Sequence, residues 1–297
     1  MGEAPVAAPD SIRTLPGRRI PMTDPSFDPV PIAEEIIAAR AAGGRLTPFT
    51  GRVPGFGFDE AYQVAGIVAC RRAARSPVAG RKIGFTNPAL WEAAGLTHPV
   101  WGTMFEETVT RTGPGGETPA ISMAGSVEPK VEIEVVVVLR SVPERGDRGA
   151  AVARHVAEIG FGFEIVDSPY PGWNMRPADA VAAGGIHHGL AVGPTVPVTD
   201  PEATAAAMAA LTVSMTLSTG SASPRHVADG AGRMVLGNPL DAVGVLVEMA
   251  ADHGSPLAAS EVVTTGSLAP PLPAAAGERY RAEAGDGVLP AAAVALT

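Results

Sequence analysis

The feature that most constrains the fold is the segment Val131–Leu139, which reads VEIEVVVVL. Its β-branched residues favour a strand, and its uninterrupted apolar end is typical of a central strand buried on both faces. Side chains alternate along a strand, so Glu132 and Glu134 point to the same side, with backbones about 7 Å apart. Two like charges on a buried strand are unfavourable unless a positive charge compensates them. The segment therefore predicts a buried sheet that carries a charged site.

A divalent cation bound by oxygen ligands would provide that compensation, and carboxylates favour Mg²⁺, Mn²⁺ or Ca²⁺ over zinc. A second acidic strand, Gly162–Asp167, sets Glu164 among apolar neighbours. Glu164 could complete a three-carboxylate metal site, and Asp167 could orient one of its ligands. Two alternatives stay open. The acids of the first strand could lie on a solvated edge, and Glu164 could pair with an arginine such as Arg176.

Two further segments offer groups that move protons. Gly80–Thr86 places Lys82 on a predicted strand, and a lysine can carry a proton when burial or a nearby cation lowers its pKa. The alternative is a lysine that simply extends from the strand into solvent. His187 and His188 follow a Gly-Gly pair, and adjacent residues on a strand face opposite ways. At most one of these histidines is therefore expected to reach a given site.

Charge and composition argue against several classes of function. The formal net charge is −9, and no run of Lys and Arg is longer than a pair, which disfavours a nucleic-acid partner. The longest run of Val, Ile and Leu is too short to cross a bilayer, and the N-terminal residues lack the apolar segment of a signal peptide. Cys70 is the only cysteine, so neither a disulfide framework nor a thiolate metal site is expected. We predict a cytoplasmic enzyme without a membrane partner.

The chain divides into three predicted parts. Residues 1–28 show no helical or strand period and are predicted to be a flexible leader. Residues 29–78 contain two predicted helices, Pro31–Ala42 and Asp59–Ala74, and form a helical N-terminal arm. Residues 79–297 form a β-rich catalytic domain, in which strands and helices do not alternate regularly. The predicted fold class is therefore α+β. Within the body, strands are predicted at Gly80–Thr86, Glu132–Leu139, Leu190–Val192, Val213–Ser218, Val262–Thr265 and near Tyr280–Glu283, and helices at Ala150–Glu158, Pro201–Ala209 and Leu240–His253.

Seven short segments occur in an order that is characteristic of one family. They are GRKIGFT (80–86), PVWGTMF (99–105), EPKVEIE (128–134), FEIVDS (163–168), WNMR (173–176), LGNPLDAV (236–243) and VVTTGSL (262–268). In this order they resemble the 2-keto-4-pentenoate hydratase and 4-oxalocrotonate decarboxylase group of the fumarylacetoacetate hydrolase superfamily. The similarity runs from about residue 31 to the end of the chain.

The resemblance implies a β-rich fold with a mixed β-roll, assembled as a homo-oligomer. It also implies an Mg²⁺ or Mn²⁺ ion bound by the carboxylates that match Glu132, Glu134 and Glu164. Lys82 matches the active-site lysine of the family. The substrate would be a small anionic 2-oxo acid that chelates the ion through its carboxylate and its 2-oxo or enol oxygen.

The binding of such an anion has two expected sources. The resemblance implies that the turn Thr265-Gly266-Ser267 offers hydrogen bonds to the substrate carboxylate. Because the net charge of −9 would repel an anion, Arg81 and Lys82, together with the metal, are expected to make the pocket locally positive.

Three positions depart from the family pattern. Val100 stands where the hydratases usually have an acidic residue, Ala182–Ile186 replaces an A-D-N-x-S stretch, and Pro169 replaces an arginine. Because these groups would handle water or protons, His187 or His188 is expected to take over a proton-transfer role.

We predict a metal-dependent lyase, of the hydratase, dehydratase or decarboxylase type, that acts through a metal-stabilised enolate. The alternatives are a C–C bond hydrolase of an acylpyruvate-type substrate, and a catalytically degenerate homologue that binds a partner subunit through its helical arm.

Overall fold

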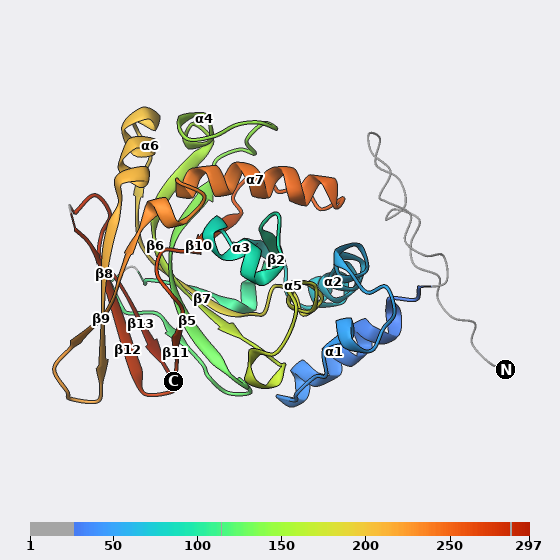
Figure 1. The fold of residues 1–297 in the computed structure, drawn as a ribbon. Helices are drawn as coiled ribbons and strands as arrows, with labels where there is room; N and C mark the ends of the chain where they lie inside the picture. The colour runs from blue at the N-terminus through green and yellow to red at the C-terminus, as the bar shows by residue number, and fades with distance from the viewer. Residues whose placement is uncertain (1–26, 114, 286) are drawn as a thin grey trace.

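Two β-sheets and a helical arm make up the molecule. The computed structural model describes residues 27–113, 115–285 and 287–297, so the predicted leader lies outside the described residues except for its last two positions. Figure 1 shows the smaller sheet on one side, the larger sheet in the middle, and the N-terminal helices on the side away from the smaller sheet. Helix α7 (Pro239–Asp252) crosses one end of the assembly.

The larger sheet contains eight strands within the described residues and mixes parallel with antiparallel pairs. Its order is β2 (Val100–Phe105), β1 (Val78–Gly84), β10 (Val262–Ser267), β5 (Pro129–Leu139), β6 (Val156–Asp167), β7 (His187–Pro197) and β3 (Val109–Arg111), and β11 (Leu272–Pro273) also pairs with β5. The smaller sheet has the order β4 (Ala120–Ile121), β13 (Ala292–Leu296), β12 (Glu278–Ala284), β8 (Thr212–Thr219) and β9 (Arg225–Ala231). The other helices of the body are α3 (Trp91–Ala94), α4 (Ala150–Ala153), α5 (Pro177–Ala182) and α6 (Pro201–Ala210).

The larger sheet curls so that its two edges approach each other. Its edge strands, β2 and β3, are joined only by the short 3-10 turn Glu106–Thr108, so they must lie close together. The inner face of this roll carries a small apolar cluster that includes Met104, Val136 and Leu190. The α+β class and the mixed β-roll expected from the sequence are confirmed.

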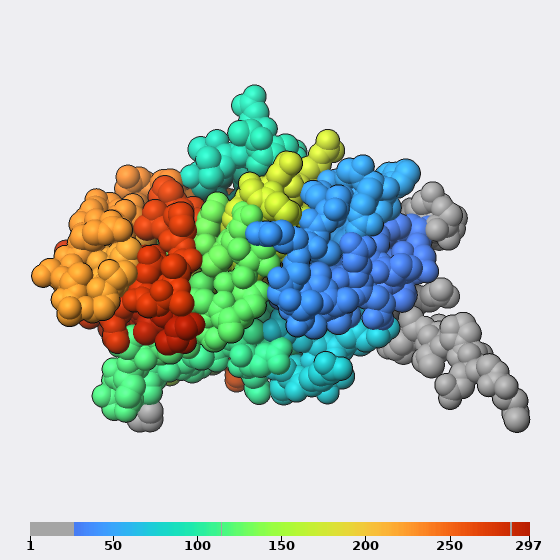
Figure 2. Space-filling view, turned by 90° about the horizontal axis from the view of Figure 1, so that it is seen from below, coloured from blue at the N-terminus to red at the C-terminus, as the bar shows by residue number. Residues whose placement is uncertain are grey.

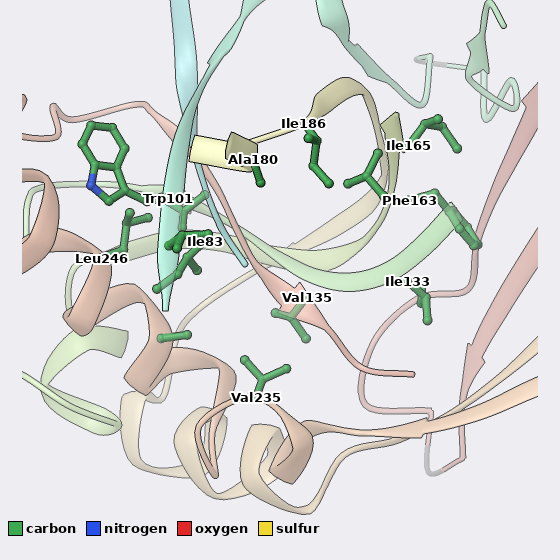
Figure 3. Close-up of a cluster of buried hydrophobic side chains, with 14 of the residues drawn as sticks. Ile83, Trp101, Ile133, Val135, Phe163, Ile165, Ala180, Ile186, Val235 and Leu246 are labelled. Carbon is green, nitrogen blue, oxygen red and sulfur yellow. The ribbon is translucent and has the colours of Figure 1, made fainter. Parts of the chain in front are cut away.

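The outer face of the roll forms the main hydrophobic core. Ile133 and Val135 of β5 are almost completely buried, and Val135 turns toward Val235 (Figure 3). Phe163 of β6 meets Tyr280 of the smaller sheet, with ring centroids 6.5 Å apart. Each fully buried side chain of this size contributes about 1.5–3 kcal/mol to the stability of the fold. The packing between the two sheets therefore fixes the position of β5 and β6.

The N-terminal arm consists of α1 (Val30–Ala42) and α2 (Phe58–Ala73). Proline in the first turn starts α1, and Gly43 ends it with a left-handed conformation, so its bounds lie close to the predicted Pro31–Ala42. The arm packs on the roll through Tyr62 of α2, which stacks on Trp101 of β2 at 5.4 Å. Figure 2 shows the blue arm lying directly against the yellow-green segment that includes α5.

The structure corrects one predicted helix. The segment Ala150–Glu158 is helical only as far as Ala153, and β6 begins at Val156. The reason is tertiary, because Val156 and Glu158 pair with the end of β5 and the apolar residues that follow fill the core. Of the elements that the sequence did not predict, β2 and α5 matter most, because they carry or adjoin the candidate site.

One apolar stretch of the described chain, Gly232–Asp252, is long and apolar enough to cross a membrane by length and composition. Half of its most apolar window is buried inside the molecule, and its helical part, α7, packs on the roll. This is the pattern of a core helix.

Candidate metal centre

Three glutamates converge inside the roll. Glu132 and Glu134 lie on the inner face of β5, and Glu164 is directly opposite Glu132 on β6. Glu134 and Glu164 are fully buried, whereas Glu132 is half-buried. One carboxylate oxygen from each residue lies within 4.8 Å of the others. The register of two neighbouring strands therefore creates a cluster of carboxylates.

This cluster has the chemistry of a site for a hard dication. Oε1 of Glu134 is buried and receives no hydrogen bond from any residue that the structure describes. Three ionised carboxylates and the ammonium group of Lys82 leave two negative charges, which one dication would neutralise. Oxygen ligands without sulfur or nitrogen favour Mg²⁺, Mn²⁺ or Ca²⁺. The residues present thus fit the predicted Mg²⁺ or Mn²⁺ ion.

The acidity of the three carboxyl groups reflects their crowding. Burial raises the pKa of Glu132 to about 7. Burial, together with the charges of Glu164 and Glu132, raises the pKa of Glu134 well above its ordinary value. Burial acts in the same direction on Glu164, but Lys82 and His187 outweigh it and hold the pKa of Glu164 below its ordinary value. Without a cation the cluster therefore retains protons that a bound dication would displace.

Lys82 lies on the inner face of β1 and points into the cluster. Its Nζ is 3.2 Å from Oε2 of Glu164 and donates a hydrogen bond to the carbonyl oxygen of Gly185 at 3.2 Å. Burial alone would lower the pKa of Lys82, but the three carboxylates raise it above its ordinary value. Without a metal the carboxylates therefore favour the protonated form of Lys82. The lowered pKa expected from the sequence assumes a cation beside the lysine, and it stays a prediction for the metal-bound protein.

The loop before β7 fits closely around this lysine. Gly185 has a positive φ of 71°, and a Cβ at this position would lie 2.9 Å from Cδ of Lys82. A residue with a side chain would therefore displace the lysine. This gives a physical reason for glycine at a position where the chain departs from the family pattern.

The two adjacent histidines have different surroundings. Nδ1 of His187 is 2.8 Å from Oε1 of Glu164, and its Nε2 is 3.0 Å from the hydroxyl of Thr108. Burial lowers the pKa of His187, so we assign a neutral ring that donates to Glu164 through Nδ1. His188 is half-buried, and its Nε2 contacts the carbonyl oxygen of Ser122.

A β-bulge determines which of these histidines meets the cluster. Glu164 pairs with Leu190, but a register shift after Ile165 pairs Val166 with His187. In an unbroken ladder, Val166 would pair with His188, which would then share the face of Glu164. A bulge that re-aims a side chain is a known feature of functional sites.

Arg81 lies on the opposite face of β1 from Lys82, and the structure does not bring it to the cluster. Its Nη1 is 3.3 Å from a carboxylate oxygen of Glu261, and its Nη2 donates to the hydroxyl of Ser255 at 3.2 Å. Burial lowers the pKa of Arg81 and raises that of Glu261. Arg81 and Glu261 therefore form a buried ion pair outside the roll.

The turn Thr265-Gly266-Ser267 borders the cluster, but its two hydroxyls and the amide of Gly266 already have partners. Thr265 donates through its hydroxyl to the carbonyl of Val135, and the amide of Gly266 donates to Oε2 of Glu134 at 2.7 Å. The hydroxyl of Ser267 donates to the carbonyl of Ala269. In this structure the turn therefore orients Glu134.

Asp167 acts at the start of β5 and not on a ligand of the cluster. Its carboxylate accepts hydrogen bonds from the backbone amides of Val127 and Glu128, at 2.8 to 3.0 Å. These bonds tie the end of β6 to the turn that leads into β5. Asp167 thereby helps to set the register in which Glu132 meets Glu164.

Sequence reasoning missed Arg40 in the N-terminal arm. Its Nη2 donates to the carbonyl of Ala183 at 2.6 Å, and both terminal nitrogens contact the carbonyl of His187 at 3.2 Å. Burial lowers the pKa of Arg40 to about 10. Arg40 holds the loop whose other groups contact Lys82 and Glu164. No spacing in α1 distinguishes it from a basic residue that favours the end of a helix.

Comparison with known proteins adds to this geometry. A scan against protein-family models finds no match. A 2-keto-4-pentenoate hydratase of Burkholderia vietnamiensis is 30% identical over 254 residues, which are 84% of this chain and 91% of that protein. The 2-keto-4-pentenoate hydratase 1 of Dechloromonas aromatica is 31% identical over 247 residues, which are 82% of this chain and 88% of that protein.

A solved structure has the same fold. The 4-oxalocrotonate decarboxylase from Pseudomonas putida G7, complexed with magnesium and adipate, superimposes with a TM-score of 0.80 and 22% sequence identity. The match covers 91% of this chain and 97% of that chain. Taken with the sequence relatives, it confirms the predicted resemblance. This chain belongs to the 2-keto-4-pentenoate hydratase family.

Proposed function

We propose that this protein is a divalent-metal-dependent lyase that acts on a small 2-oxo or 2-hydroxydienoic acid. The observation that carries the proposal is the convergence of Glu132, Glu134 and Glu164 within 4.8 Å, with Lys82 beside them. The names of the relatives, 2-keto-4-pentenoate hydratase and 2-hydroxyhexa-2,4-dienoate hydratase, support this class of substrate.

The three glutamates would bind Mg²⁺ or Mn²⁺. When bound, the dication supplies two positive charges, which polarise a 2-oxo group and offset the carboxylate field that keeps Lys82 protonated. The cluster lies inside the roll, where Glu134 and Glu164 are fully buried, so electrostatic interactions are stronger there than in water. This favours the binding of an anionic acid despite the net charge of −9.

Lys82 is the proposed proton carrier. Its Nζ is held between Glu164 and the carbonyl of Gly185, which fixes the direction of its remaining proton. An ammonium group in this position can donate a proton to a carbon of an enolate, and the neutral amine can take one back. General acid–base catalysis of this kind contributes about 10²- to 10⁴-fold to the rate.

His187 is proposed as the residue that orients Glu164. Both of its ring nitrogens already have protein partners, Glu164 and Thr108, so neither is free to exchange a proton with a substrate in this arrangement. A hydrogen bond from an imidazole to a ligating carboxylate fixes the carboxylate's direction. His188 is proposed to have no catalytic role, because its Nε2 contacts Ser122 outside the cluster.

Metal binding provides the first test. Isothermal titration calorimetry with Mg²⁺ should give a single site in the wild-type protein and none in Glu134→Gln. The matched control is Glu106→Gln, an exposed glutamate that should leave binding unchanged. Equal binding by the wild type and Glu134→Gln would refute the metal assignment.

Product analysis tests the reaction. Incubation of the Mg²⁺-loaded protein with 2-keto-4-pentenoate, followed by NMR, should give one hydrated product. Release of carbon dioxide from a dicarboxylic 2-oxo acid would instead identify a decarboxylase. Formation of two acids from an acylpyruvate would identify the C–C hydrolase alternative. A protein that binds Mg²⁺ but transforms none of the three would support the degenerate homologue.

The proposal extends to a homo-oligomer, which the family resemblance implies, and to a location in the cytoplasm. Light scattering coupled to size-exclusion chromatography measures the assembly directly. A monomeric mass under conditions in which the protein is active would contradict that part of the proposal.

A further inference from the structure

A cavity of about 800 Å³ lies at one end of the roll. Its walls come from the N-terminal arm at residues 50–58, from the segment 85–95 after β1, and from residues 173–178 after β6. Neither the three glutamates nor Lys82 lines it. Side chains other than those of the charged cluster therefore form the cavity, and its contents need their own explanation.

Strand directions place this cavity at the end where the cluster is most exposed. From Lys82, β1 runs toward Phe85, and β6 runs from Glu164 toward Trp173. Because β5 is antiparallel to β6, the residues before Glu134, namely the half-buried Glu132 and then Lys130, lie toward the same end. Nζ of Lys130 lies 3.8 Å from the ring centroid of Trp173, a residue of the cavity wall. The cavity thus lies next to Lys130, two residues before Glu132 on the same face of β5.

Two aromatic residues of the wall have strained backbones. Phe85 has a φ of 56° and Trp173 a φ of 57°, in the left-handed region that bulky residues rarely adopt. Each is held by a hydrogen bond, from Trp91 Nε1 to the carbonyl of Phe85 and from Trp173 Nε1 to the carbonyl of Glu128. Strain of this kind clusters at ligand clamps and active sites. It is unexpected in an ordinary surface turn.

Aromatic side chains line one part of the wall, and polar and charged residues line the rest. Phe56, Phe58 and Met175 join the two strained aromatics, and Phe85 remains 37% exposed. The charged side chains of the wall, Glu92 and Arg176, are both exposed and have opposite signs. Lys130, which does not line the cavity, already lies over the ring of Trp173, so a second carboxylate on the ligand would gain little from the charges here. An uncharged apolar group fits this lining best.

The cavity is also large for the substrate of a 2-keto-4-pentenoate hydratase. At about 30 Å³ per non-hydrogen atom, the share of a water molecule in the liquid, the eight such atoms of 2-keto-4-pentenoate fill about 240 Å³. The cavity alone, without the space around the glutamate cluster, offers about three times that volume. A five-carbon acid would leave most of the aromatic wall in contact with water.

We propose that this cavity binds the apolar, ring-sized tail of a 2-oxo acid whose carboxylate end reaches the three-glutamate cluster. The inference rests on the proposed function, because the cluster must bind the 2-oxo acid end. It deepens that function by specifying an extended, uncharged tail. Phe85 and Trp173 are the residues that would determine specificity for the tail.

Calorimetry on the Mg²⁺-loaded protein tests the proposal with three ligands: pyruvate, 2-oxo-4-phenylbutanoate and 2-oxoglutarate. The phenyl compound should bind at least tenfold more tightly than pyruvate, and 2-oxoglutarate should not. Trp173→Ala and Phe85→Ala should each remove most of this gain and change the affinity for pyruvate less than twofold. Trp173→Phe, which keeps an aromatic ring, should retain most of it. Leu90→Ala is the matched control, because Leu90 is 57% exposed in the same segment and lies outside the cavity wall.

The outcomes separate the two proposals. Binding of pyruvate without any gain from the phenyl group would overturn the tail site and leave the proposed function intact. A gain that survives in both alanine variants, or a larger gain for 2-oxoglutarate, would also overturn the tail site. Failure of all three ligands to bind would overturn the proposed function and the tail site together.

Discussion

Replacing Glu132 with glutamine should stabilise the metal-free protein at neutral and alkaline pH. Burial raises the pKa of Glu132 to about 7, because its ionised form is disfavoured in the cluster. A pKa of about 7 in place of 4.5 corresponds to about 3 kcal/mol, at about 1.36 kcal/mol for each pKa unit. Glutamine has no charge to bury, and so it avoids this cost.

The sign of the pH dependence follows from linkage. Below the unfolded pKa of 4.5 this carboxyl group is neutral in both states and imposes no cost on folding. As the pH rises from 4.5 through about 7, the unfolded state loses the proton before the folded state does, and the folded state is destabilised. The stability difference between Glu132→Gln and the wild type should therefore be small near pH 5 and reach its full value at pH 8.

Thermal unfolding followed by circular dichroism in EDTA measures this difference. For a chain of this length, about 3 kcal/mol corresponds to about 5 °C in Tm. Addition of Mg²⁺ at about 100 times its Kd should stabilise the wild type by about 2.7 kcal/mol and Glu132→Gln by much less. Glu106→Gln, on the surface, should behave like the wild type under all conditions. A variant that melts below the wild type at pH 8 in EDTA would refute this reasoning.

Three further predictions concern the surroundings of the cluster. Lys82→Met should preserve Mg²⁺ binding in calorimetry but lower turnover by about 10²- to 10⁴-fold, and wild-type turnover would exclude Lys82 as the proton carrier. Arg40→Ala should lower the free energy of unfolding by about 1.5–3 kcal/mol, because its charged hydrogen bonds are lost. It should also speed hydrogen exchange in residues 183–187, and unchanged exchange there would contradict the role of Arg40. Glu261→Gln should destabilise the protein by about 3–5 kcal/mol in urea unfolding, because the guanidinium of Arg81 stays buried without its partner, and a loss below 1 kcal/mol would show that water reaches this pair.

The strand pattern of the site could be predicted from sequence because it depends on local periodicity. Alternation puts Glu132 and Glu134 on one face, and the long apolar run makes their strand central. Pairing with Glu164 requires only that the next acidic strand lies beside the first. These are short-range signals, and the structure preserves them.

The rest depends on contacts between distant segments. The choice of His187 over His188 follows from a bulge between β6 and β7, which the Gly-Gly pair before the histidines does not specify. Arg40 meets a loop more than 140 positions further along the chain. The end of the predicted helix at Ala150–Glu158 is lost because pairing with β5 outweighs local helix preference. In each case tertiary packing decides between conformations that the local sequence allows.

The pairing of Glu132 with Glu164 also limits how this protein can diverge. If β6 slipped by one position along β5, Phe163 would point into the roll. Glu164 would then point into the hydrophobic core on the outer face of the roll. A single-residue insertion or deletion within β6 would thus damage stability and chemistry at once. Insertions and deletions among related sequences should therefore be concentrated in loops such as the one between β8 and β9, away from the two strands that carry the glutamates.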